Sequence, residues 1–233
     1  KQIDCLFSLR TPTNKNPLFN GASEFKINNY LEYLTGLEYK SNGTINSINQ
    51  IYIGRGKKNL LFFDVGSPPA KKYSKNYQSG PLSFEYFIDN YKIITNCGFG
   101  HKISKKAEII SRLTSAQSTL CLNDSSVAKF EKNNLIDTAF GASLTNSFKV
   151  SDLKINDDKN YLTISARHNA YEGNFNYIHK RMIKIDKINS NLLGEDNLFG
   201  LKENNTSGKK RIYQTKGKEG SVPKSEEKEK THS

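Results

Sequence analysis

The stretch that decides the fold class is residues 77–124, YQSGPLSFEYFIDNYKIITNCGFGHKISKKAEIISRLTSAQSTLCLND. Every second residue from Leu82 to Ile88 is large and apolar, which is the period of a strand with one buried face. Asp89-Asn90 then forms a two-residue turn of a kind that tolerates positive φ, and 91–95 supplies the return strand. Residues 118–122 read as a third strand. The stretch therefore predicts the core of an antiparallel sheet.

Turn-forming residues separate further strand candidates along the chain. These candidates are residues 48–52, 59–64, 147–153, 161–166 and 177–187. Short apolar runs divided by turn signals at this spacing are typical of all-β proteins. The sequence thus predicts a mainly β fold, in the form of an antiparallel β-sandwich or a larger antiparallel sheet stack.

One short helix is expected near the N-terminus. Ser23 caps it, Leu34 ends its apolar side, and Gly36 acts as a stop. For residues 103–113 the sequence leaves two interpretations open, a helical turn or a loop with strand character. No other segment predicts a helix.

Three regions follow from this pattern. Residues 1–22 are expected to be an irregular lead-in from a missing upstream domain, and residues 23–201 form the β-sandwich domain. Residues 202–233 hold almost no apolar side chain, so they cannot bury enough surface to offset the entropy lost on ordering. We expect this tail to be disordered.

Length and composition limit the protein class. The 233 residues are 35% apolar, enough for one substantial core. The chain starts at Lys1 without Met, without a signal segment and without a run long enough to span a membrane, so we expect a piece of a longer protein. Cys5, Cys97 and Cys121 are odd in number and lack CxxC spacing, which favours small buried residues over a disulfide or a metal site.

The formal net charge is +12. The lysines are scattered rather than gathered in a stripe, and no DNA- or RNA-binding motif accompanies them, so no nucleic-acid partner is predicted. A solvated surface accounts for such charge. The same field would also attract polyanions, including acidic polysaccharides.

Several phrases occur in an order that resembles the C-terminal β-domain of the heparinase II/III-like family. They are residues 17–22 (PLFNGA), 63–69 (FDVGSPP), 80–85 (GPLSFE), 96–98 (NCG), 115–120 (SAQSTL), 168–171 (HNAY), 179–181 (HKR) and 194–196 (GED). The resemblance covers roughly residues 17–200. It implies a bacterial polysaccharide lyase in which this β-sandwich follows an α/α-toroid, and it suggests the periplasm or cell envelope.

The resemblance also implies a chemistry. Family members cleave uronate-containing polysaccharides by β-elimination: the carboxylate is neutralised, a base removes the C5 proton, and an acid protonates the leaving oxygen. Most of that machinery comes from the toroid. We therefore expect the sandwich portion to have little activity on its own, with an acidic polysaccharide and the missing toroid as its partners.

This sequence departs from the family at three positions. The family commonly carries histidine just ahead of the LSFE phrase, where residues 77–80 hold none, and again where Gln117 stands. Zinc-binding members have an aspartate where this chain has Asn96. A glutamine amide neither shuttles protons near neutral pH nor offers the imidazole nitrogen that zinc prefers. We predict no metal and no cofactor.

Four residues remain as site candidates. His168 is the catalytic candidate, at the edge of a site that contacts an acidic sugar; alternatively, it closes a strand end by bonding to backbone. Tyr171, His179 and Arg181 are substrate-binding candidates, with His179 and Arg181 on one strand face. As readily, these two residues pair with Glu195 or Asp196 in a structural network.

Glu85 either orients a site residue or pairs with a lysine, and we expect the lysine pair. The competing function is a non-catalytic domain whose basic surface binds or scaffolds an acidic carbohydrate without cleaving it.

Overall fold

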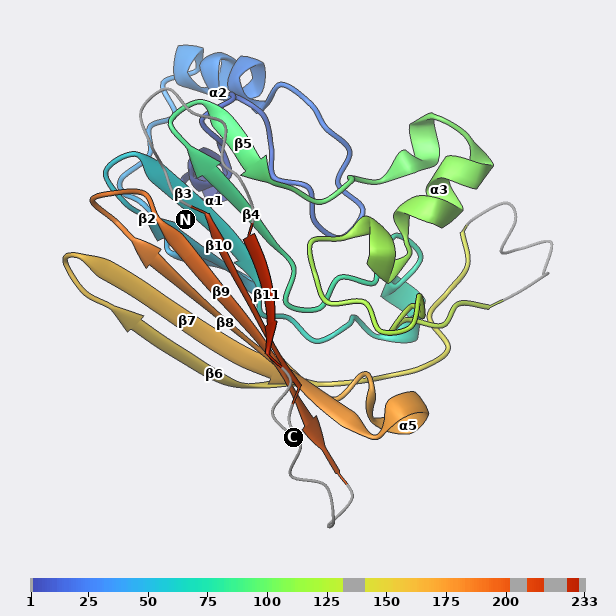
Figure 1. Cartoon of the computed structure of the whole chain (residues 1–233). Coiled ribbons are helices and arrows are strands. Elements are labelled where there is room, and N and C mark those ends of the chain that lie inside the picture. The colour runs from blue at the N-terminus through green and yellow to red at the C-terminus, as the bar shows by residue number, and fades with distance from the viewer. Residues whose placement is uncertain (1, 132–140, 202–208, 216–225, 231–233) are drawn as a thin grey trace.

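Two antiparallel sheets face one another in the computed structural model, which describes residues 2–131, 141–201, 209–215 and 226–230 (Figure 1). The five strands of the first sheet follow chain order. They are β1 (Ser47–Ile48), β2 (Ile51–Arg55), β3 (Asn59–Asp64), β4 (Phe84–Ile88) and β5 (Tyr91–Ile94). The predicted strand at 59–64 and the hairpin at 82–95 are confirmed here. The single strand predicted at 48–52 is wrong, because a turn at 49–50, where Asn49 has φ 52°, divides it between β1 and β2.

The second sheet is a meander in the order β11-β10-β9-β8-β7-β6. Its strands are β6 (Val150–Asp157), β7 (Tyr161–His168), β8 (Tyr177–Asp186), β9 (Leu192–Gly200), β10 (Lys209–Thr215) and β11 (Glu226–Lys230). The mainly β fold is confirmed, and its arrangement is that of a β-sandwich. Strand β9 had no counterpart among the predicted strands.

The main core lies between the two sheets, where apolar residues of alternate positions meet. Leu61, Phe63 and Tyr86 from the first sheet pack with Leu162 and Ile183 from the second, and all five are fully buried. Burial of this kind supplies about 25 cal/mol per Å² of apolar surface. The apolar side chains at every second position of β7 and β8 therefore face this interface.

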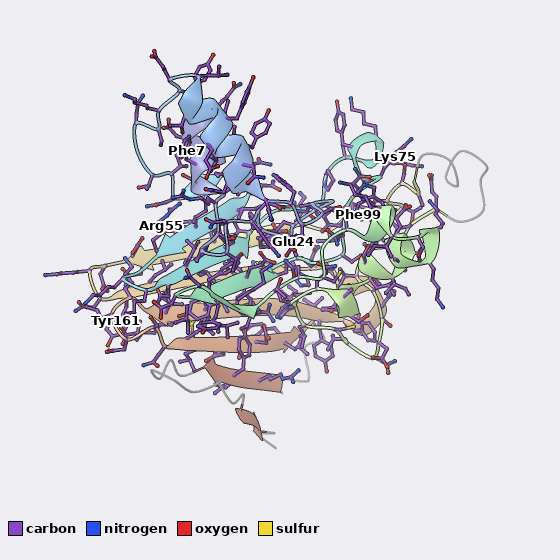
Figure 2. The ribbon with its side chains drawn as sticks, turned by 90° about the horizontal axis from the view of Figure 1, so that it is seen from above. Phe7, Glu24, Arg55, Lys75, Phe99 and Tyr161 are labelled. Carbon is purple, nitrogen blue, oxygen red and sulfur yellow. The ribbon has the colours of Figure 1, made fainter. Side chains whose placement is uncertain are left out.

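The other face of the first sheet is buried as well. Phe62 and Phe87 point away from the second sheet and pack against Phe19 of the N-terminal segment. Figure 2 shows the N-terminal helices on this outer side of the sheet. The prediction that the strand at 82–88 has one buried face is wrong, because Glu85 and Phe87 are both fully buried too.

Helices border the sandwich rather than forming a layer within it. They are α1 (Gln2–Ser8), α2 (Ile27–Gly36), α3 (Lys105–Ser111), α5 (Glu172–Phe175) and the 3-10 helices η1 (Lys71–Tyr73), η2 (Gly100–Lys102) and η3 (Thr114–Ala116). The predicted helix is α2, but it starts later because the Ser23 hydroxyl donates to Phe99 O instead of capping. Residues 103–113 contain a helix, with Ser104 as its N-cap. Helix α1 lies in the lead-in that was expected to be irregular.

Residues 118–122 form no strand, which corrects the prediction. The side chain of Ser118 takes the place that a neighbouring strand would have, since its Oγ accepts from Phe84 N–H at 2.8 Å and lies within hydrogen-bond distance of Phe84 O. The Thr119 hydroxyl donates to Pro81 O at 2.6 Å. The segment is thus a loop fixed to the sheet by its hydroxyl groups.

Part of the predicted disordered tail pairs with the second sheet. Strand β10 runs antiparallel to β9, with Tyr213 opposite Gly194. The Tyr213 ring lies over that glycine, where a Cβ would come within 1.9 Å of the ring, and stacks on Phe84 at 6.1 Å between centroids. Two apolar side chains, Ile212 and Tyr213, thus accompany the added strand. Residues 202–208, 216–225 and 231–233 lie outside the described part.

Candidate functional site

A buried group of charged residues lies on adjacent strands of the second sheet. Arg181 on β8 binds Asp196 on β9 through two parallel hydrogen bonds, Nε to Oδ1 at 2.7 Å and Nη2 to Oδ2 at 2.8 Å. Both side chains are 4% exposed. His179 donates from Nε2 to the same Oδ1 at 2.7 Å. We call His168, His179, Arg181 and Asp196 the arginine centre.

Hydrogen bonds fix the tautomers of the two histidines. Ala170 N–H donates to His168 Nδ1, so the proton of His168 is on Nε2, which lies 2.9 Å from His179 Nδ1. His179 in turn keeps its proton on Nε2 for Asp196. Every ring nitrogen is therefore used, and both rings are neutral. Burial lowers the pKa of His168 and of His179 below their ordinary value.

Asp196 stays ionised in this buried place. Burial by itself would raise its pKa, but the charge of Arg181 and the hydrogen bonds from Arg181 and His179 hold the pKa well below the ordinary value. The arginine centre thus consists of the Arg181–Asp196 ion pair and two neutral imidazoles, of which His179 bonds to Asp196 and His168 bonds to His179. The alternative that His179 and Arg181 pair with an acidic residue of the GED phrase is the arrangement found.

The arginine centre and Tyr171 hold one loop. Arg181 Nη1 donates to Ser118 O at 2.6 Å and to Leu82 O at 2.8 Å. The Tyr171 hydroxyl donates to Leu120 O. The four residues singled out from the sequence thus come together, and two of them fix the segment from Ser118 to Leu120.

A cleft of about 390 Å³ opens beside this loop. Its lining combines aromatic and apolar side chains with charged and hydroxyl groups: Phe84, Ile94, Ser118, Thr119, Leu120, Arg181, Asp196, Arg211 and Tyr213. Of the four candidates, Arg181 lines it, whereas His168 lies deeper and is 1% exposed.

Three buried amides gather next to the same loop. Gln117 Nε2 and Gln78 Nε2 each donate to Ser111 O at 2.8 Å, so the two side chains meet at one carbonyl. Asn96 Oδ1 accepts from Ser118 N–H at 3.0 Å. We call Gln78, Asn96 and Gln117 the amide centre. Ser118 connects it to the arginine centre.

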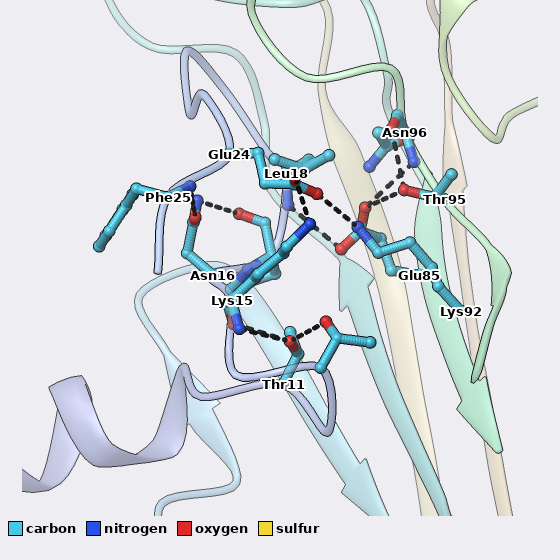
Figure 3. A network of polar contacts seen from close by, with 12 residues as sticks. Thr11, Lys15, Asn16, Leu18, Glu24, Phe25, Glu85, Lys92, Thr95 and Asn96 are labelled. Carbon is cyan, nitrogen blue, oxygen red and sulfur yellow. Dashed lines mark hydrogen bonds and ion pairs between the residues drawn. The ribbon is translucent and has the colours of Figure 1, made fainter. Parts of the chain in front are cut away.

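Buried acceptors also fasten the N-terminal segment to the first sheet. Glu85 accepts from Leu18 N–H, Asn96 N–H and the Thr95 hydroxyl, as Figure 3 shows. Gln78 Oε1 accepts from Gly21 N–H at 3.0 Å. These bonds explain why acidic and amide residues occupy buried positions on this sheet.

The expectation that Glu85 pairs with a lysine is wrong. Lys92 Nζ lies 3.9 Å from Glu24 Oε2. The oxygens of Glu85 accept instead from two backbone N–H groups and a hydroxyl. Burial raises the pKa of Glu85, and these hydrogen bonds and the charge of Lys92 oppose that rise. Its structural role is to join the N-terminal segment to the end of β5.

Comparison with models of protein families assigns the chain to one family. The family described as heparinase II/III-like, C-terminal, matches residues 48–213, from β1 into β10. The chain belongs to the heparinase II/III-like family. No curated protein matches it by sequence.

Solved structures of heparinases share the fold. The chain is similar to heparan sulfate lyase HepC from Pedobacter heparinus, with 16% identity, a TM-score of 0.60 and coverage of 92% of this chain and 34% of that one. It is also similar to a heparinase III gene product, with 13% identity, a TM-score of 0.59 and coverage of 91% and 33%. The chain thus spans about a third of the length of these heparinases.

The amide centre does not fit the zinc site that the family resemblance implies for some members. Gln78 and Gln117 present amide nitrogens, which carry hydrogen atoms and no lone pair for a metal. The acceptor oxygens of Gln78 and Asn96 are already engaged by backbone N–H groups. Within the ranges that the structure describes, no three His, Cys, Asp or Glu side chains are grouped so as to hold a metal ion.

Some residues of the site had no individual signal in the sequence. Ser118 and Leu120 lie in the SAQSTL phrase. They bond to Arg181 and Tyr171 through their backbone carbonyls, and a carbonyl carries no signal in the sequence. Asp64 lies in the FDVGSPP phrase and accepts from Gly66 N–H and Asn20 Nδ2. None of the helices in the described residues has the length and hydropathy needed to cross a membrane.

Proposed function

We propose that this chain is the β-sandwich part of a polysaccharide lyase that acts on uronate-containing polysaccharides by β-elimination. The family match over residues 48–213 carries the proposal. In this reaction a base takes the C5 proton of the uronate, the electron pair forms the C4–C5 double bond, and the C4–O bond breaks with protonation of the leaving oxygen. The missing upstream part of the protein supplies the groups that transfer these protons.

The role of the sandwich is to position a loop. His168 and His179 are neutral and fully bonded, so they act through Asp196 and Arg181 rather than by touching the sugar. Arg181 and Tyr171 then hold the segment 118–120 at the rim of the cleft. In this proposal the substrate meets the loop and the cleft, and the buried residues are positioning residues. The scaffold fixes geometry in advance, as catalysis requires.

The test uses the full-length protein that contains this chain. It is incubated with heparan sulfate, other glycosaminoglycans and alginate, and the absorbance of the unsaturated uronate product is followed. The proposal expects product from at least one of them. A folded full-length protein that yields no product from any of these glycans contradicts it.

A matched pair of variants tests the positioning role. Tyr171→Phe removes the hydroxyl that holds Leu120 O but keeps the ring, and we expect about a tenfold loss of kcat/KM, equivalent to about 1.4 kcal/mol. The loss should fall mainly on kcat, with the melting temperature nearly unchanged. Tyr161→Phe, at an exposed tyrosine, is the control. Equal effects of the two variants would contradict a positioning role for Tyr171.

One observation favours a second candidate, an acidic-carbohydrate-binding domain without activity. Neither the segment 77–80 nor position 117 holds the histidine that the family commonly has there, and the amides of Gln78 and Gln117 are engaged by backbone groups. With a net charge of +12, such a domain would retain acidic glycans. Salt-dependent glycan binding by the full-length protein, with no unsaturated product, would support it; product formation would exclude it.

A further inference from the structure

The amide centre joins three segments that are distant in the sequence. Gln78 accepts from Gly21 N–H and donates from Nε2 toward Gly98 O at 2.9 Å and Ser111 O at 2.8 Å. It thereby ties the N-terminal segment, the loop after β5 and the end of α3 to one side chain. The residue is 1% exposed, so these bonds are shielded from water.

Gln117 reaches the same point from the loop that the arginine centre holds. Its Nε2 donates to Ser111 O at 2.8 Å and lies 3.7 Å from Cys97 Sγ. Two side-chain nitrogens that donate to one oxygen atom point toward a common place, as the ligands of a bound metal ion must. The position therefore has the convergence of a metal site without its ligand chemistry.

Asn96 contributes the most informative atom of the centre. Its Oδ1 accepts from Ser118 N–H, which fixes the orientation of the amide. Its Nδ2 is buried and has no hydrogen-bond partner among the described residues. A buried donor without an acceptor is unfavourable by about 1–3 kcal/mol. An aspartate in the same orientation would keep the bond from Ser118 and put a second oxygen at that place.

We infer that the amide centre connects its segments by hydrogen bonds, without a metal, at a place where three residue exchanges would create a divalent-cation site. Three exchanges, Gln78→His, Asn96→Asp and Gln117→His, convert it into a site with two imidazole ligands and one carboxylate. In this chain, hydrogen bonds to Ser111 O hold the segments together. In the variant, a bound ion would hold them together. The inference does not rest on lyase activity, since it concerns binding and stability only.

The experiment compares zinc binding by the triple variant and by the unchanged protein. Calorimetry should show one Zn²⁺ bound by Q78H/N96D/Q117H at least 100-fold more tightly than by the unchanged protein. Added zinc should raise the melting temperature of the variant by several degrees, and a chelator should reverse the rise. The melting temperature of the unchanged protein should respond to neither.

Two partial variants serve as matched controls. Asn96→Asp alone and the pair Q78H/Q117H each lack part of the ligand set, so both should bind zinc far more weakly than the triple variant. If the triple variant folds only with metal, circular dichroism during zinc titration gives the readout.

Three results would overturn the inference. The first is stoichiometric zinc binding with a stabilising effect in the unchanged protein. The second is a folded triple variant that binds zinc no better than Asn96→Asp. The third is a triple variant that stays unfolded with and without zinc, because the three positions would then not share one coordination sphere.

Discussion

Asp64 at the end of β3 and Asp196 in β9 are both buried, one in each sheet, yet their pKa values shift in opposite directions. Asp64 accepts from neutral donors, Gly66 N–H at 2.9 Å and Asn20 Nδ2 at 3.3 Å, and burial raises its pKa to about 7. Asp196 is bound by Arg181 and His179, which hold its pKa below the ordinary value against the effect of burial.

The difference shows that burial alone does not set the charge of a carboxyl group. In the first sheet, backbone and amide donors stabilise a carboxylate too little to offset desolvation. In the second sheet, a guanidinium with two parallel bonds does offset it. Asp64, which bonds to Asn20 of the N-terminal segment, is therefore sensitive to pH near neutrality, whereas the ion pair that holds the loop 118–120 is not.

The largest effect should follow from breaking the ion pair of the second sheet. Arg181→Met leaves the Asp196 carboxylate buried without a cation and leaves the carbonyls of Leu82 and Ser118 without this donor, so we expect a loss of about 3–5 kcal/mol in the free energy of unfolding. Denaturant titration measures it. Arg167→Met removes an exposed pair with Asp152 and should cost no more than about 1 kcal/mol. A similar cost for both variants would refute the distinction.

Asp64 should give an effect of intermediate size that depends on pH. Its folded-state pKa of about 7 exceeds its ordinary value of 3.8, so its contribution to stability is complete below 3.8 and is lost as pH rises through about 7. The loss should amount to roughly 2–4 kcal/mol. Asp64→Asn should remove this dependence and be more stable than the unchanged protein above that range.

Unfolding midpoints measured from about pH 4 to about pH 8 test this expectation. Asp152→Asn, at an exposed aspartate, is the matched control. Parallel profiles for Asp64→Asn and the unchanged protein would show that Asp64 is ionised in the folded state throughout.

The smallest effect concerns the neutral histidines of the second sheet. Burial lowers the pKa of His168 below 6.5, so its contribution is present above 6.5 and is lost as pH falls below that value. His168→Gln should flatten the acid side of the stability profile. The contributions of Asp64 and His168 to stability change with pH in opposite directions. The measurement is therefore better made in the Asp64→Asn variant, where the contribution of Asp64 is absent. His101→Gln, at an exposed histidine, is the control, and an equal flattening there would contradict the assignment.

Sequence patterns anticipated the strands well where apolar residues alternate. The hairpin of β4 and β5 was predicted, including a turn residue of positive φ, since Asp89 has φ 48°. The loop at 118–122 was misread because its serine and threonine satisfy backbone groups through their side chains. Periodicity does not distinguish such a loop from a strand.

Of the candidate site, the sequence supplied the residues but not their relation to one another. His168, Tyr171, His179 and Arg181 were identified, and an acidic partner in the GED phrase was among the alternatives. Which of its two acidic residues faces inward depends on the register of β8 and β9, where Arg181 lies opposite Asp196.

The sequence by itself determined the β architecture and the family, because strand alternation, turns and short phrases are local properties of the chain. Only the tertiary structure decided the charge state of each buried group and the meeting of Gln78 and Gln117 at Ser111 O. Those properties depend on desolvation and on partners 15 to 67 positions away, such as Asp196 for Arg181 and Leu18 for Glu85. Such distances leave no periodic signal in the sequence.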